Sequence, residues 1–183
     1  MIRIQHLLGR SLRPSLATTC AALLVLGGLT LTAAMPLWQS PAGVEIQAPA
    51  ELIRLADAAA RAEGLDPHLV RSMIQCESRF NPASVSAQGS LGLMQVMPKT
   101  GARFGITRLL DPQENLKAGT RYLRFLLDRY QGDTARAVVA YNAGEEAMDR
   151  AHGVAPTEES RTYAIAVLDL YERKPVVPAE AGR

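Results

Sequence analysis

Apolar residues recur every three or four positions along most of the chain from residue 51 to residue 173, which is the spacing of amphipathic helices. The expected helices cover residues 51–63, 67–79, 98–105, 112–130, 134–142 and 158–173. Asp66, Asp111 and Asp133 each stand directly before such a stretch, where an N-cap is expected. No stretch alternates apolar and polar residues over the length of a strand. The pattern therefore predicts an all-α fold.

The second expected helix carries an acid on its apolar face. Val70, Met73 and Ile74 form the apolar stripe, and Glu77 follows them at helical spacing. Burying a carboxylate is unfavourable unless it has a partner or a function. One hypothesis is a general acid, because burial raises the pKa of a carboxyl group and keeps its proton in place at neutral pH. The alternative is a glutamate at a helix end that points to solvent or pairs with Arg79.

Four sequence motifs follow one another along the chain. They read E-S-R-F-N-P with S-x-x-G-S-L-G-L-M-Q-V-M-P, then N-L-K-A-G-T-R-Y-L, A-Y-N-A-G and P-T-E-E-S-R-T-Y. In this order they resemble the signature of the soluble lytic transglycosylases, relatives of goose-type lysozyme. The resemblance covers roughly residues 51–171. It implies a lysozyme-like single helical domain with a substrate groove, here residues 51–173.

The resemblance implies that the protein cleaves the β-1,4 bond between N-acetylmuramic acid and N-acetylglucosamine in peptidoglycan. In this family one glutamate, matched by Glu77, first protonates the bond and then acts as base while the muramic 6-hydroxyl attacks C1. The product is a 1,6-anhydro ring. Residues 78–110 hold no second acid, which suits this route, whereas a conventional glycosidase uses two carboxylates. A goose-type hydrolase and a non-catalytic wall-binding module remain alternatives.

The resemblance also implies a set of substrate-binding residues. Ser86, Gln95 and Met97 match loop positions that line the groove, and Tyr141 and Asn142 match the pair that faces the catalytic glutamate. Each has a simpler explanation. Ser86 is also typical of a turn, Gln95 could brace the loop backbone, and Tyr141 and Met97 could pack in the core.

Other acids lie further along the chain. Glu145, Glu146, Glu158 and Glu159 could approach the groove only through the fold. Glu159 matches the P-x-x-E element of the family. This match implies that Glu159 supports the residues that contact the substrate and does not contact the substrate itself. The histidines His6, His68 and His152 are scattered without ligand spacing. We therefore expect no metal site and no cofactor.

Composition and charge limit the kinds of partner that the chain is expected to bind. The chain of 183 residues is 48% hydrophobic and 21% charged, with a net charge of +2. Residues 1–34 hold three arginines and no acid, so the remaining chain has 17 basic and 18 acidic residues. It has no basic excess that would favour nucleic acid. Cys20 falls in this first segment, which leaves Cys76 as a single thiol, expected to be a buried core residue rather than a nucleophile.

Residues 1–34 have the pattern of an export segment, with a basic start, an apolar run from Leu16 to Leu31, and small residues at its end. It predicts a periplasmic protein with either a cleaved signal peptide or an intact inner-membrane anchor. Residues 35–50 are expected to be a linker and residues 174–183 a disordered tail. The expected partner is the glycan strand of peptidoglycan. The small size suggests a specialised enzyme that opens the wall locally for a secretion or conjugation apparatus, and we expect a monomer.

Overall fold

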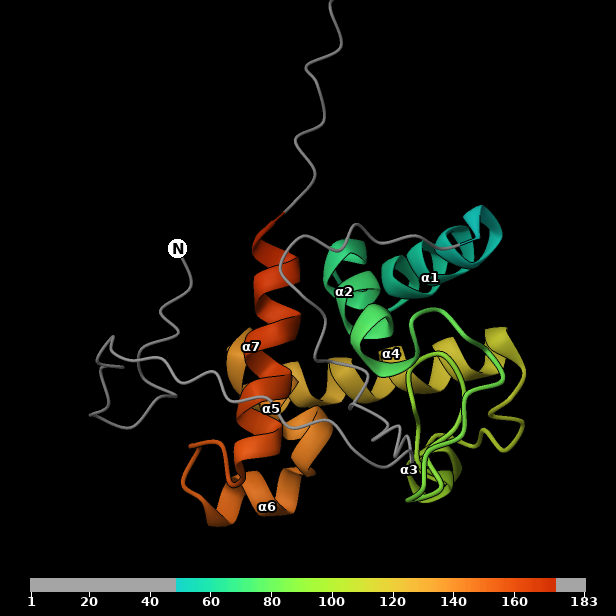
Figure 1. Cartoon of the computed structure of the whole chain (residues 1–183). Coiled ribbons are helices and arrows are strands. Elements are labelled where there is room, and N and C mark those ends of the chain that lie inside the picture. The colour runs from blue at the N-terminus through green and yellow to red at the C-terminus, as the bar shows by residue number, and fades with distance from the viewer. Residues whose placement is uncertain (1–48, 174–183) are drawn as a thin grey trace, which may run out of the picture.

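The computed structural model describes residues 49–173, and helices account for most of them (Figure 1). They are α1 (Ala50–Ala62), α2 (Pro67–Ser78), α3 (Pro98–Arg103), α4 (Pro112–Arg129), α5 (Thr134–Ala143), α6 (Glu145–Arg150) and α7 (Glu158–Glu172). Within this range there is no strand, only isolated bridges that join Leu91 to Val85 and to Val96. The all-α prediction is confirmed. The expected export segment, most of the expected linker and the expected tail lie outside the described residues.

Short polar side chains set the starts of three helices, as the sequence predicted. Asp66 accepts a hydrogen bond from the backbone N–H of His68, Asp111 accepts from those of Gln113 and Glu114, and Asp133 accepts from that of Arg136. Each carboxylate satisfies N–H groups that have no partner within the first helical turn. The predicted helices therefore begin and end within two residues of those observed.

The sequence did not predict α6. Gly144 adopts φ 85° and ψ 142°, so it ends α5 as expected, but the chain turns into a new helix at the next residue. That helix has only six residues, of which Met148 alone is buried. A helix this short shows no recurring apolar stripe, which is the signal on which helix prediction depends.

The centre of the fold is α5, which packs against α4, α6 and α7. Half of its ten residues are buried alanines and valines, and these small residues allow its neighbours to approach closely. A second layer forms where α2 packs against α1 and α7 (Figure 1). The end of α2 therefore lies over the centre of the molecule rather than at its edge.

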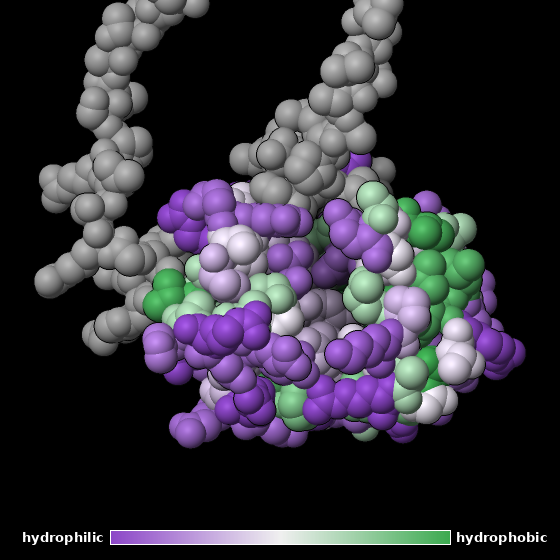
Figure 2. Space-filling view, turned by 90° about the horizontal axis from the view of Figure 1, so that it is seen from below, coloured by the Kyte–Doolittle hydropathy of each residue, from purple (hydrophilic) through white to green (hydrophobic). Residues whose placement is uncertain are grey.

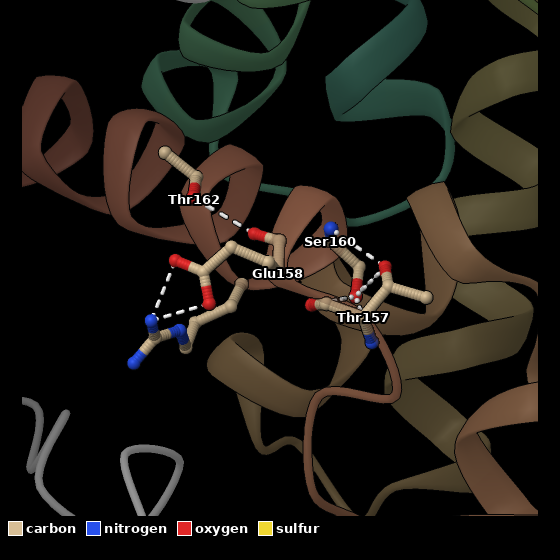
Figure 3. Close-up of polar contacts among 5 residues, drawn as sticks. Thr157, Glu158, Ser160 and Thr162 are labelled. Carbon is tan, nitrogen blue, oxygen red and sulfur yellow. Dashed lines mark hydrogen bonds and ion pairs between the residues drawn. The ribbon is translucent and has the colours of Figure 1, made fainter.

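A capping box fixes the start of α7. The Thr157 hydroxyl accepts a hydrogen bond of 3.1 Å from the Ser160 N–H, and the Ser160 hydroxyl accepts one of 3.3 Å from the Thr157 N–H (Figure 3). The Thr162 hydroxyl donates to the carbonyl of Glu158 at 2.8 Å, and Arg161 pairs with the Glu158 carboxylate. With the first turn held in this way, the buried Tyr163 enters the core one turn later.

Candidate active site

Glu77 lies in the last turn of α2, at a helix end with an unusual backbone. Arg79 and Phe80 follow it with φ 51° and 60°, so two successive non-glycine residues adopt the left-handed conformation. Strain of this kind persists only where surrounding contacts enforce it. Here the Ser78 hydroxyl donates 2.8 Å to the carbonyl of Leu93, and Phe80 is buried. The helix end that carries Glu77 is therefore tied to the following loop.

Burial raises the pKa of Glu77 to about 8. Two tyrosines share its surroundings, since burial and then the charge of Glu77 raise the pKa of both Tyr141 and Tyr163. The Tyr163 hydroxyl opposes the burial effect and lowers the Glu77 pKa, yet it forms no hydrogen bond of standard geometry within residues 49–173. Glu77 is therefore a carboxyl group that stays protonated at neutral pH. The Tyr163 hydroxyl is buried beside it.

The thiol next to Glu77 takes no part in such chemistry. Cys76 is buried with only 6% of its surface exposed, and burial raises its pKa to about 12. A thiol with that pKa is protonated at neutral pH, whereas only a thiolate is a good nucleophile. The prediction of a buried core cysteine is confirmed.

Two of the predicted loop residues hold the loop itself together. The Gln95 side-chain amide donates to the carbonyls of Gly92 at 2.8 Å and Ser84 at 3.2 Å. The Ser90 hydroxyl lies 2.7 Å from the Ser86 hydroxyl and 2.8 Å from the Gln95 side-chain oxygen. The bracing and turn-forming roles considered for Gln95 and Ser86 are therefore both present. Their predicted contact with substrate stays a prediction.

A buried asparagine that the sequence analysis missed fixes the other side of the loop. Asn115 of α4 has no exposed surface, and its side-chain oxygen accepts 2.8 Å from the N–H of Met94. Its amide donates to the carbonyls of Leu91 at 2.7 Å and Leu109 at 2.8 Å. The available signal was an asparagine one turn before Gly119 on the apolar face of α4. Such a residue must find partners once it is buried.

A cavity of about 560 Å³ opens between the end of the loop, α3, α6 and the end of α5. Seen from the side of α3 and α6, the molecule is hollowed, and hydrophilic side chains surround the hollow (Figure 2). Gln95, Met97, Tyr141 and Asn142 line this cavity, so four of the five predicted substrate-binding residues meet there. The fifth, Ser86, lies outside the lining.

Tyr141 connects the cavity to Glu77, because it lines the cavity and also lies in the electric field of the carboxyl group. Its hydroxyl donates 3.0 Å to the carbonyl of Met94, and its ring centroid lies 5.1 Å from that of Tyr122. Gly119 provides the space: a Cβ there would lie 2.5 Å from the Met94 sulfur and 3.0 Å from the Tyr141 hydroxyl. The glycine of the N-L-K-A-G motif is therefore required by packing.

The cavity wall contains the carboxylate of Glu145, which the sequence could not place. Glu145 accepts 2.6 Å from the Tyr122 hydroxyl and pairs with Arg103 at 2.8 Å. Burial alone would raise the Glu145 pKa, but the Tyr122 hydroxyl, the backbone N–H of Glu145 and Arg103 together outweigh it and lower the pKa. Arg103 in turn lies 4.0 Å from the ring centroid of Phe125. Glu145 is therefore an ionised group whose two oxygens are both engaged.

The remaining predicted site residue, Glu159, lies at the start of α7. It is exposed in the first turn of α7. No hydrogen bond or ion pair seen among residues 49–173 joins it to the site, and its neighbour Ser160 provides the buried contact there. Its supporting role stays a prediction.

Comparison with known proteins identifies related sequences and folds. A family described as the transglycosylase SLT domain matches residues 54–164. The chain is 45% identical over 87 residues to a transglycosylase of Enterobacteria phage PRD1, covering 48% of this chain and 32% of that protein. It is 35% identical over 107 residues to membrane-bound lytic murein transglycosylase C of Actinobacillus pleuropneumoniae, covering 49% and 29%. The chain thus spans about a third of the length of these relatives.

Among solved structures, the 70 kDa soluble lytic transglycosylase of Escherichia coli aligns with a TM-score of 0.59 and 26% identity. The alignment covers 64% of this chain and 23% of that one. This similarity confirms the lysozyme-like all-α fold that the resemblance implied.

Proposed function

Because the chain belongs to the transglycosylase SLT domain family, we propose that it is a peptidoglycan lytic transglycosylase. It cleaves the β-1,4 bond between N-acetylmuramic acid and N-acetylglucosamine and leaves a 1,6-anhydromuramic end. The observation that carries this proposal is Glu77, whose pKa burial raises to about 8. At neutral pH such a group can give its proton to the glycosidic oxygen. The transglycosylase names of the relatives support the same activity.

In the proposed reaction Glu77 acts twice. It first transfers its proton to the leaving oxygen as the bond between that oxygen and C1 breaks. The ionised Glu77 then removes the proton of the muramic 6-hydroxyl, whose oxygen forms the new bond to C1. The raised pKa favours this return step as much as the first, because an isolated carboxylate is disfavoured in a buried position. The Tyr163 hydroxyl, which lowers the Glu77 pKa, favours the ionised form between the two steps.

The cavity next to Tyr141 is the proposed substrate site. Its volume of about 560 Å³ falls within the range of ordinary ligand pockets. Met97 and Asn142 are exposed at its surface, so their side chains can contact an N-acetyl sugar without any rearrangement. Gln95 and Tyr141 hold the wall in place, and Ser86 is proposed to contact substrate at the outer part of the loop.

A hydrolase on the same fold would need a water molecule and, in the usual case, a second carboxylate to activate it. The cavity wall offers Glu145 and Glu146. Glu145 is held by Tyr122 and Arg103, which makes it a weak base. Glu146 is exposed at the rim. With no carboxylate prepared to activate water, the nearest nucleophile is the sugar's own hydroxyl, which acts within the same molecule.

Digestion of purified sacculi in water enriched in heavy oxygen tests this proposal. A lytic transglycosylase yields anhydromuropeptides, which are lighter by one water than hydrolysis products and carry no label at the new end. Reducing-end muramic acid with heavy oxygen as the main product would contradict the proposal. The Glu77→Gln protein should release no muropeptides, whereas Glu51→Gln, an exposed residue of α1, should retain full activity.

The proposed compartment is the periplasm, reached through the export segment in residues 1–34. A fusion of residues 1–40 to a reporter should be exported, and sequencing the N-terminus of the mature protein distinguishes a cleaved signal from an anchor. In the described range, 49–173, no helix is long and apolar enough to cross a membrane. A reporter that stays in the cytoplasm would contradict this assignment.

A further inference from the structure

The cavity wall carries positive charges that the proposed chemistry does not use. Lys99 of α3 and Arg150 of α6 both line the cavity, and both side chains are exposed. Neither takes part in an ion pair seen among residues 49–173. The third cation of the wall, Arg103, is already paired with Glu145. Lys99 and Arg150 are thus available for an anionic ligand.

The fold brings these two cations to one cavity from two different helices, α3 and α6. Arg103 of α3 and Glu145 of α6 join the two helices through their ion pair. Lys99 lies one turn before Arg103 on α3, and therefore on the same side of that helix. Arg150 lies at the other end of α6 from Glu145. The charges of Arg103 and Glu145 cancel in their ion pair. Glu146 is then the one remaining acid of the cavity lining whose charge could offset that of the two cations.

Peptidoglycan carries its negative charge in a particular place. The N-acetylated sugars are neutral, and the carboxylates belong to the lactyl group of muramic acid or to the peptide attached to it. Arginine binds a carboxylate through a planar pair of N–H donors, and lysine binds it as a compact charge. A strand whose sugars occupy the cavity would hold these carboxylates close to its walls.

We propose that Lys99 and Arg150 form a binding site for the carboxylates on the muramic acid substituent, so that acidic strands bind more tightly than neutral ones. This inference rests on the proposed function and specifies its substrate. The two cations determine affinity rather than chemistry, because both lie on the cavity wall and the proposed proton transfers belong to Glu77. They act on binding, and the catalytic acid acts on the bond.

Binding to three kinds of soluble strand tests the proposal. The first carries intact peptides, the second is stripped by an amidase and keeps only lactyl carboxylates, and the third carries peptides whose carboxyl groups are blocked as methylamides. The protein carries Glu77→Gln so that the strands survive, and Kd is measured by fluorescence anisotropy. The test variant adds Lys99→Gln and Arg150→Gln. The matched control adds Arg54→Gln and Lys117→Gln, which remove two exposed cations outside the cavity lining.

We expect the test variant to weaken binding of an acidic strand by about 3- to 30-fold, the range of two partly exposed ion pairs. Binding of the blocked strand should stay unchanged, and the control should match the parent protein. A loss confined to intact strands assigns the site to peptide carboxylates, and a loss on stripped strands assigns it to lactyl carboxylates. Equal affinity of test variant and parent for both acidic strands would overturn the inference, as would an equal loss on the blocked strand.

The result of this binding test does not depend on whether the protein is a lyase or a hydrolase. Products formed by the wild-type protein in heavy-oxygen water decide between lyase and hydrolase, whereas Kd values of the Glu77→Gln protein decide on the carboxylate site. Added salt gives a further reading, because ion pairs at a partly exposed site are screened. The parent protein should lose affinity for acidic strands as salt rises, and the test variant should lose less.

Discussion

The hydroxyl of Tyr141 donates a hydrogen bond of 3.0 Å to the main-chain carbonyl of Met94, which joins α5 to the loop that follows α2. Tyr141 is only 8% exposed, so its hydroxyl has little access to water. The single proton of the phenol is used by this carbonyl. The resemblance implies that Tyr141 faces the catalytic glutamate, a position from which its hydroxyl could also donate to that carboxyl group or to the sugar. In this structure the donor instead holds the loop.

The first prediction concerns this bond. Tyr141→Phe leaves the Met94 carbonyl without its donor, so we expect the free energy of unfolding to fall by about 1–2 kcal/mol and kcat/KM on peptidoglycan to fall with it. Urea denaturation and muropeptide release measure the two effects. Tyr130→Phe is a suitable control, because its hydroxyl contacts Asp149 at the surface. Equal stability of the two variants would show that the hydrogen bond to the Met94 carbonyl does not contribute to stability.

The helical framework was predictable because its signals are local. N-caps such as Asp111, apolar stripes and the position of Glu77 on one stripe all depend on residues within two turns of one another. Two of the three partners of Asn115 lie 21 and 24 positions away in the chain, and the two partners of Glu145 lie 23 and 42 positions away. No pattern along the chain encodes such pairings. Helix α6 was missed for the opposite reason, since it is too short to show a pattern.

The second prediction tests the buried asparagine. Asn115→Ala leaves the Met94 N–H and the Leu109 carbonyl without their partner, whereas the Leu91 carbonyl keeps the N–H of Val96. Each buried polar group left without a partner costs about 1–3 kcal/mol, so we expect a loss of at least about 2 kcal/mol in urea denaturation. Asn142→Ala, exposed on α5, should change the stability by less than about 0.5 kcal/mol. Similar losses for the two variants would rule out a special role for Asn115.

The third prediction concerns stability and pH. The Glu77 pKa is about 8 in the folded protein against an ordinary value of 4.5 for a glutamate, so between these pH values the folded state binds one more proton than the unfolded state. The stability provided by this proton is complete below pH 4.5 and is lost as pH rises toward 8. Glu77→Gln has no such proton to lose. Its stability advantage over wild type should grow between pH 5 and pH 8, by up to a few kcal/mol.

Thermal or urea denaturation of both proteins across this pH range measures the effect. The comparison within one pH value cancels the titration of all other groups, since these are the same in both proteins. If the stability advantage of Glu77→Gln stayed constant or shrank from pH 5 to pH 8, this result would contradict the raised pKa of Glu77.

The fourth prediction concerns the hydroxyl of Tyr163, which is buried beside Glu77 without a hydrogen bond of standard geometry. This hydroxyl lowers the Glu77 pKa. Tyr163→Phe removes it and keeps the ring, so the Glu77 pKa should rise further. Because protonated Glu77 is the acid form, kcat/KM of the wild-type enzyme should decline above about pH 8. In the variant this decline should move to higher pH.

The same substitution should lower the maximal rate, because the ionised Glu77 that forms after the first proton transfer loses a stabilising donor. A merely structural role for Tyr163 would reduce the rate equally at all pH values, so the position of the alkaline decline separates the two explanations. Tyr122→Phe is the matched control, since it removes a cavity-wall hydroxyl that bonds Glu145 and is not among the groups that influence the Glu77 pKa. If kcat/KM declined at the same pH in wild type and Tyr163→Phe, the Tyr163 hydroxyl would have no influence on the Glu77 pKa. A shift in Tyr163→Phe that is absent from Tyr122→Phe would identify Tyr163 as the residue that sets the proton affinity of Glu77.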